Sequence, residues 1–242
     1  GLLLKEIFAF YGAFRQGRTP QPPRGPAYRE YIAWLRKQDV AGTERYWREA
    51  LAGFSAPTPL PSDKGAGRAE GSGTRTLHLE LSAEETAALQ EFARGHQLTL
   101  STLVQGAWAL LLGRYAGQED VLFGATVSGR PPELAGSDAM VGLLINSLPV
   151  RVRLPSGEGV AQWLRGLQAR LAGLRQHESS PLVRVQGWSD VPRGLPLFES
   201  LVAFENYPLD ASVWEGVEDL GVRDYLAVER TNFPLTLVVT PG

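Results

Sequence analysis

The amino-acid sequence predicts a layered α/β fold that follows an initial helical segment. Three features indicate it: apolar residues at helical spacing over 2–51, a proline- and glycine-rich break over 54–73, and alternating strand and helix patterns from residue 74 onward. The chain has 242 residues, 43% of them hydrophobic, and can therefore bury a sizeable apolar core. We expect a helical part at 1–53, a linker at 54–73 and one α/β lobe at 74–242.

Three helices are expected before the break. Residues 2–14 have helical periodicity, and a loop punctuated by glycine and proline separates them from a second helix near 28–35. The third helix begins at Asp39, because aspartate is a favourable N-cap residue. We expect the tryptophans of these helices to anchor the core: Trp34 and Trp47.

The break at 54–73 contains three prolines and four glycines, a composition typical of a linker. Residues 74–81 then alternate between leucine and polar side chains, which predicts a strand with Leu77, Leu79 and Leu81 facing inward. Further apolar runs predict strands at 121–127, 148–154, 201–207, 222–229 and 233–240.

Helices are expected between these strands. Ser82 and Glu85 have the spacing of a capping box and start the first of them. Ser101 is expected to cap the next, whose nearly continuous apolar surface predicts burial on several sides. A helix with an apolar stripe is expected at 160–177, and Ser180-Pro181 predicts an N-cap followed by proline at the first helical position.

Composition and charge exclude several classes of protein. The 24 basic and 26 acidic residues give a formal net charge of -2, without the positive surplus that a nucleic-acid binder needs. Cysteine is absent, which rules out disulfides, thiolate metal sites and a cysteine nucleophile, and suits a reducing compartment. No apolar stretch approaches the roughly 18 residues that a membrane span requires. We therefore predict a cytoplasmic location without nucleic-acid or membrane partners.

The three histidines do not predict a self-contained active site. His78 lies on the polar face of a predicted strand, His96 in a turn, and His177 at a helix C-terminus, where a cation is favoured by the helix dipole. Their spacing fits no zinc motif, and the sequence has neither a Gly-x-Ser-x-Gly nucleophile elbow nor a phosphate-binding loop. Local chemistry alone predicts no metal site and no catalytic centre within these residues.

Five short segments, taken in order, carry a family resemblance. They are Tyr28–Trp34, Gly124–Pro131, Met140–Arg151, His177–Leu182 and Arg193–Phe198. Together they resemble the motifs of condensation domains from nonribosomal peptide synthetases, and they extend over nearly the whole chain. Three positions depart from the usual motifs: Glu30 replaces aspartate, Leu144 replaces an aromatic residue and Ser147 replaces threonine.

The resemblance implies a lobe similar to chloramphenicol acetyltransferase, a two-layer α/β sandwich, with N-terminal helices left over from a preceding lobe. In this family two lobes enclose a tunnel, which receives the phosphopantetheine arms of a donor and an acceptor peptidyl carrier protein. The acceptor amine attacks the donor thioester to form a peptide bond, as in antibiotic biosynthesis. An adenylation domain is the implied neighbour in the parent chain, and no directly bound cofactor is implied.

The family's catalytic motif, His-His-x-x-x-Asp-Gly, normally stands just before a helix like the one predicted at 2–14. We therefore expect the catalytic histidines upstream of Gly1, a lobe truncated at its end, and no activity of this fragment alone. The segment 180–188 is most similar to the subtype that joins an L-donor to an L-acceptor.

Site residues follow from the same resemblance. Asn146 and Ser147 are expected near the substrate tunnel, and Asn206 is expected to face the substrate amide. Three further residues are expected in the floor loop or between the lobes: Arg130, Gly142 and Arg193. Asn146 and Asn206 have a second interpretation, in which they hydrogen-bond backbone groups at strand ends.

Two other functions stay open at this point. The chain is alternatively a non-catalytic module that presents a surface for carrier proteins. It is alternatively a free-standing acyltransferase that uses coenzyme A, with His177 as its base. The residues upstream of Gly1 would separate these functions, because a His-His-x-x-x-Asp-Gly motif there would leave His177 with a structural role.

Overall fold

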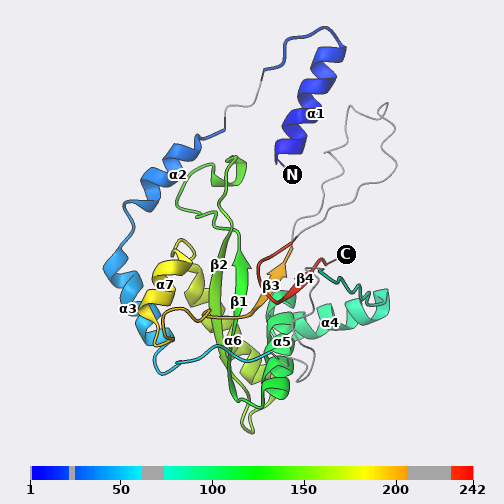
Figure 1. Ribbon diagram of the computed structural model, residues 1–242. Coiled ribbons are helices and arrows are strands. Elements are labelled where there is room, and N and C mark those ends of the chain that lie inside the picture. Colours follow the sequence, from blue (N-terminus) through cyan, green and yellow to red (C-terminus); the bar gives the residue numbers. More distant parts are fainter. Residues whose placement is uncertain (1, 22–24, 61–73, 206–229, 242) are drawn as a thin grey trace.

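A computed structural model describes residues 2–21, 25–60, 74–205 and 230–241 of the chain. Its centre is a four-stranded mixed sheet in the order β2-β1-β3-β4 (Figure 1). The strands are β1 (Asp120–Val127), β2 (Asn146–Arg153), β3 (Ser200–Phe204) and β4 (Leu235–Val239). β2 is antiparallel to β1, whereas β3 is parallel to β1 and to β4. This sheet confirms the predicted α/β class.

Seven α-helices are seen in the described ranges of the chain. They are α1 (Leu2–Arg15), α2 (Tyr28–Leu35), α3 (Val40–Ala50), α4 (Ala83–Gly95), α5 (Leu100–Ala116), α6 (Val160–Arg175) and α7 (Leu182–Trp188). Helix α5 contacts both β1 and α6, and α7 contacts α3 and β2. In contrast, α1 has no buried residue and stands clear of the sheet in Figure 1. None of the described helices is long and apolar enough to cross a membrane.

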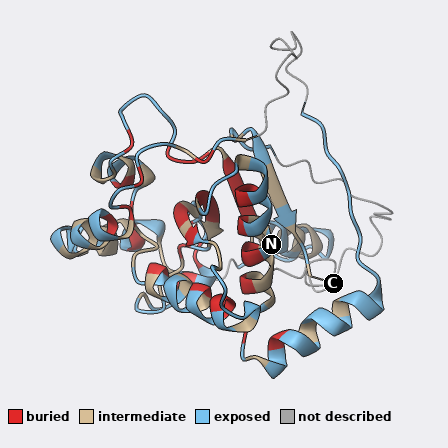
Figure 2. Cartoon of the chain, turned by 90° about the horizontal axis from the view of Figure 1, so that it is seen from below, coloured by how far each residue is buried: buried red, intermediate tan, exposed pale blue. Residues whose placement is uncertain are grey.

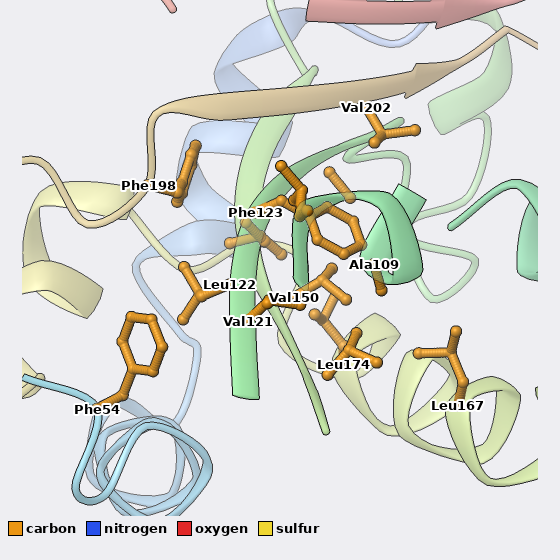
Figure 3. Packing of buried hydrophobic residues seen from close by; sticks show 14 of the residues in the cluster. Phe54, Ala109, Val121, Leu122, Phe123, Val150, Leu167, Leu174, Phe198 and Val202 are labelled. Carbon is orange, nitrogen blue, oxygen red and sulfur yellow. The ribbon is translucent and has the colours of Figure 1, made fainter. Parts of the chain in front are cut away.

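The apolar core lies on both faces of β1. Val121, Leu122 and Phe123 are all buried, as expected for a continuous apolar run in an internal strand. Figure 3 shows Phe123 on the side of the α5 residue Ala109, and Leu122 on the opposite side. Each large apolar side chain that is fully removed from water contributes about 1.5–3 kcal/mol. Figure 2 shows the buried residues gathered where the strands and helices meet.

Two of the predicted helix starts are confirmed by their cap contacts. The Asp39 carboxylate accepts a hydrogen bond from the Gly42 amide at 3.0 Å. Ser82 and Glu85 form the reciprocal capping box, with the Ser82 amide donating to the Glu85 carboxylate at 2.8 Å. These contacts are local in sequence, which is why the pattern alone was sufficient to predict them.

The other two predicted caps are wrong. Helix α5 is capped by Thr99, whose hydroxyl accepts from the Thr102 amide at 3.1 Å, and the hydroxyl of Ser101 instead accepts from Gln105. Helix α7 has Pro181 at its N-cap position, so the proline stands one residue before the helix. The Ser180 hydroxyl instead accepts a hydrogen bond from Trp47, a distant residue that the sequence pattern cannot reveal, as described below.

The predicted strand at 74–81 is also wrong. The segment has no strand pairing, and Leu77 and Leu79 are 82% and 89% exposed. A strand needs a neighbour that satisfies its backbone groups, and no pairing within the described sheet involves these residues. The alternation of these residues therefore predicts which side of the segment is apolar, but it does not predict which other element would pack against that side.

The remaining elements largely follow their predicted ranges. The strands expected at 201–207 and 233–240 are present as β3 and β4, and residues 206 and 207 lie outside the described ranges. The strand expected at 222–229 and most of the proposed linker lie outside the described residues. The described start of the linker packs on the core: Thr58 is buried and its hydroxyl accepts from the Leu122 amide at 2.8 Å. The division at 54–73 stays a prediction.

Candidate functional site

The loop from Ser128 to Ile145 is held together by its own side chains. It connects β1 to β2 at the end of the sheet where Val127 pairs with Asn146. Inside the loop, the Arg130 guanidinium donates to the carbonyl oxygens of Ser137 and Met140, the latter at 3.1 Å. A half-buried guanidinium that is bonded to two carbonyls fixes their relative positions. Arg130, predicted for the floor loop, thus bonds within this loop.

The root of the loop is the part next to the sheet, where Gly129 after β1 lies against Leu144 before β2. No other residue can replace Gly129 without strain. Gly129 has a φ of +60°, in the left-handed region that favours glycine. A Cβ at this position would stand 1.7 Å from the carbonyl oxygen of Leu144, on the returning side of the loop. The two sides of the loop root therefore approach each other as closely as a bare backbone permits.

Helix α2 packs against this loop and brings two of the predicted motifs together. The Tyr28 hydroxyl donates to the Leu143 carbonyl at 2.9 Å, and its ring lies where a Cβ on Gly142 would stand. Tyr31, Met140 and Leu144 form a small buried cluster separate from the main core. Gly142 therefore lies between the loop and α2, where its missing side chain permits a close approach.

The turn between α6 and α7 joins the start of β2. The Asn146 side-chain amide donates to the carbonyls of Glu178 at 2.9 Å and Ser180 at 2.7 Å, and its oxygen accepts from the Ser147 amide at 2.9 Å. These contacts are the ones expected from the second interpretation of Asn146, in which it satisfies backbone groups. Its place near a substrate, and that of its neighbour Ser147, stay predictions.

The same turn is anchored to α3. The Trp47 indole donates to the Ser180 hydroxyl at 2.8 Å, and this hydroxyl donates to the His177 carbonyl at 2.7 Å. The His177 ring stacks on Tyr46 with centroids 4.0 Å apart. Burial lowers the pKa of His177. The imidazole is therefore favoured in its neutral form, packed against an aromatic ring.

A cavity of about 1630 Å³ opens beside the loop root. One group of its neutral polar lining residues lies at the start of α5 and on the facing side of α6: Thr99, Ser101, Thr102, Gln105 and Gln168. Its charged lining residues lie in the loop, at and just after the end of α6, and just after β3: Arg130, Glu133, Arg175, Glu178 and Glu205. His177 is not among its lining residues, so the cavity gives no support to this histidine as a base.

Among the lining residues that were not predicted as site residues are Gln105 and Glu178. Gln105 is buried, and its side-chain oxygen has no hydrogen-bond partner in the part of the chain that is described. A single amide within an almost entirely apolar helical run was the available signal. Glu178 lies inside one of the family motifs, but only the tertiary structure places its carboxylate near Gly129 and Tyr31.

The two remaining predicted site residues are Arg193 and Asn206. Arg193 is exposed, in the turn that precedes Phe198. Phe198 is buried against Gly124, where a Cβ would stand 2.2 Å from the ring. Asn206 lies outside the described residues. In the described ranges, no three or more His, Cys, Asp or Glu side chains are grouped to hold a metal ion.

Comparison with known proteins identifies the family. The sequence model of the condensation domain family matches residues 1–242. The chain belongs to the condensation domain family. It is 47% identical over 243 residues to one of the linear gramicidin synthase proteins of Brevibacillus parabrevis, a match that covers 100% of this chain and 3% of that protein.

Solved structures of condensation domains share the fold. The first condensation domain of the CDA synthetase has a TM-score of 0.63 at 22% identity, over 85% of this chain and 45% of that one. The X-domain in a complex with OxyB from teicoplanin biosynthesis has a TM-score of 0.69 at 28% identity, over 87% of this chain and 49% of that one. The predicted chloramphenicol acetyltransferase-like α/β lobe is confirmed, and the chain spans about half the length of these structures.

Proposed function

We propose that this chain is part of a condensation domain that forms a peptide bond between two carrier-bound substrates. The main support is the convergence of motifs that lie far apart in the sequence. The segments at 28–34, 124–131, 140–151 and 177–182 all reach the root of one loop, beside one large cavity. In a condensation domain, the wall of a substrate tunnel would have this organisation.

The proposed reaction is an acyl transfer from sulfur to nitrogen. The acceptor amine attacks the carbonyl carbon of the donor thioester, a C–N bond forms, the C–S bond breaks, and the amine's proton accompanies the departure of the thiol. Holding amine and thioester in contact supplies much of the acceleration. The phosphopantetheine arms of donor and acceptor carrier proteins would bring these groups into the cavity, with an adenylation domain elsewhere in the parent chain.

The general base would come from outside these residues. The sequence contains no adjacent pair of histidines, and none of its histidines lines the cavity. We therefore propose that this chain alone does not form the bond. In the proposal, Asn146, Ser147 and Asn206 contribute polar groups to the tunnel, and three residues contribute to the loop or to contacts between lobes: Arg130, Gly142 and Arg193.

A peptide-bond assay with both loaded carrier proteins tests this function. We expect the complete parent domain to transfer the donor acyl group to the acceptor carrier, detected by intact-protein mass spectrometry. The 242-residue chain alone should give no product above the uncatalysed rate. Turnover by the isolated chain, or its absence from the complete domain, would contradict the proposal.

A second candidate function is a protein-binding module without chemistry. It is favoured by the similarity to the X-domain, which was solved in complex with another protein, OxyB. Under this alternative the complete domain binds a partner protein but transfers no acyl group. Parallel measurement of acyl transfer and of carrier binding by calorimetry separates the two functions.

A further inference from the structure

Gln105 on α5 has a side-chain oxygen without a partner. The residue is 8% exposed, and its Oε1 is buried with no hydrogen-bond partner in the ranges of the chain that the structure describes. Its Nε2 donates to the Ser101 hydroxyl oxygen, one turn earlier on the same helix, at 3.1 Å. Buried polar atoms are normally paired, because an unpaired one has lost its bonds to water. The oxygen of Gln105 therefore indicates a partner that comes from elsewhere.

A second glutamine on the same cavity has both of its polar atoms paired. Gln168 on α6 lines the cavity, and its Oε1 accepts from the Thr99 amide at 2.9 Å and from the Thr102 hydroxyl at 3.1 Å. Its Nε2 donates to the Gln97 carbonyl at 2.8 Å. Gln168 thus makes the polar contacts between α6 and the start of α5, and the oxygen of Gln105 takes no part in them.

The cavity wall near Gln105 indicates the class of ligand. Gln105 lines the cavity of about 1630 Å³ together with apolar residues of two strands, Ala125 and Val127 on β1 and Val202 and Phe204 on β3. An amide oxygen only accepts hydrogen bonds, so its partner must carry an N–H or O–H group. Apolar walls with a few polar groups are typical of ligand sites, and burying a charge beside them is costly. A neutral amide N–H on a partly apolar ligand fits both conditions.

We infer that Gln105 is a substrate-binding residue, whose Oε1 accepts a hydrogen bond from a secondary amide N–H of a carrier-bound substrate. This inference rests on the proposed function, which brings such substrates into the cavity. The observation that carries it is the unpaired oxygen of a buried side chain that lines the cavity. The amide belongs either to the phosphopantetheine arm or to the backbone of a peptidyl donor. Because Gln105 takes no part in bond making, its loss should affect binding more than turnover.

Stability measurements separate a binding role from a structural one. Gln105→Met removes the acceptor and keeps an unbranched side chain of similar volume, so the melting temperature of the complete parent domain should stay the same or rise. Gln168→Met is the matched change at the paired glutamine, and it should lower the melting temperature, because the Thr99 amide loses its acceptor. Gln162→Met, at an exposed position of α6, should behave as wild type. A decrease for Gln105→Met as large as that for Gln168→Met would overturn the inference.

The kinetic test uses the complete parent domain with both loaded carriers. Gln105→Met should raise the KM for at least one carrier substrate by about two- to tenfold, the range of one neutral hydrogen bond, and leave kcat within about twofold. An unchanged KM for both carriers, or a loss confined to kcat, would overturn the inference.

Binding of pantetheine identifies the source of the amide without catalysis. Pantetheine carries the amides of the arm and no acyl chain, and calorimetry compares its binding to wild type and to Gln105→Met. If the arm supplies the N–H, the variant should bind pantetheine about two- to tenfold more weakly. If the donor backbone supplies it, pantetheine should bind both proteins equally, and N-methylation of the donor amide should remove the difference in KM.

The outcomes also distinguish this inference from the proposed function. Weaker pantetheine binding by Gln105→Met, in a parent domain whose wild type transfers no acyl group, would overturn the proposed function but keep the binding site. Equal pantetheine binding, together with a KM difference that persists after N-methylation of the donor amide, would overturn the inference. If pantetheine binds too weakly for calorimetry, the KM comparison with the N-methylated donor decides.

Discussion

The root of the 128–145 loop and the segment at 74–81 both have clear sequence patterns, yet only the loop root is fixed by partners. At the root, Asn146 donates to two carbonyls of the α6–α7 turn, and Gly129 lies against Leu144. At 74–81, regularly spaced leucines remain exposed. A pattern predicts which face of a segment is apolar, whereas the position of that segment depends on the residues that it meets.

Residues of the family motifs near the loop root are also fixed by polar contacts with residues far away in the sequence. Trp47 and Ser180 are 133 residues apart, and Asn146 and Ser180 are 34 apart, yet each pair is joined by a hydrogen bond shorter than 3 Å. Buried polar groups are costly unless they are paired, so such contacts specify one arrangement. The motif residues near the cavity therefore also hold the structure that surrounds it.

The largest expected effect is the loss of the Trp47 side chain. Trp47 is 1% exposed and bonds to Ser180, so Trp47→Ala should lower the free energy of unfolding of the complete domain by about 3–5 kcal/mol. Trp47→Phe keeps most of the ring and removes the N–H donor, and should cost about 1–2 kcal/mol. Urea unfolding followed by circular dichroism measures both changes.

The control for Trp47 is a similar truncation at an exposed site. Tyr115 on α5 is 69% exposed, and Tyr115→Ala should change the free energy of unfolding by no more than about 0.5 kcal/mol. A Trp47→Ala loss as small as that of Tyr115→Ala would mean that the α3 contact does not hold the turn.

A smaller effect is expected from the titration of His177. Because its folded-state pKa is lowered by burial, the unfolded chain binds the proton more readily. The stability contribution is present above the unfolded pKa, near 6.5, and is lost as the pH falls from there toward the folded pKa. Urea unfolding of the complete domain at a series of pH values between about 7.5 and 5 measures it.

His177→Phe isolates this titration. Phenylalanine retains an aromatic ring to stack on Tyr46, whose centroid lies 4.0 Å from that of His177, and removes the proton-binding group. The variant should lose less stability than wild type as the pH falls. Parallel pH profiles for the two proteins would show that His177 is not the group responsible.

The sequence was sufficient for the parts of the fold that depend on neighbours in the chain. The Asp39 cap, the Ser82–Glu85 capping box and the buried run of β1 each depend on residues a few positions apart. Thr99 and Ser101 have similar cap propensities, so the pattern could not decide between them, and contacts in the folded structure do.

The sequence motifs predicted which residues belong to the candidate site. They did not predict which of these residues contact one another. The resemblance placed Asn146 and Arg130 near a tunnel and a floor loop, but their hydrogen-bond partners depend on how loop, turn and helix meet. Glu178 was not predicted as a cavity residue, because only the folded structure brings the α6–α7 turn to the start of β2 and to the cavity.

The smallest expected effect comes from the segment at 74–81. Leu79 is 89% exposed, so Leu79→Ser in this chain should change the free energy of unfolding by no more than about 0.5 kcal/mol, because no contact is lost. The same substitution in the complete parent domain tests whether this segment, like the loop root, is fixed by a partner. A loss there of about 2 kcal/mol or more, the range for a buried leucine, would mean that these leucines meet a partner outside the described residues. An equally small change in both proteins would mean that this alternation remains a surface feature. Urea unfolding of the two pairs of proteins under identical conditions distinguishes these outcomes.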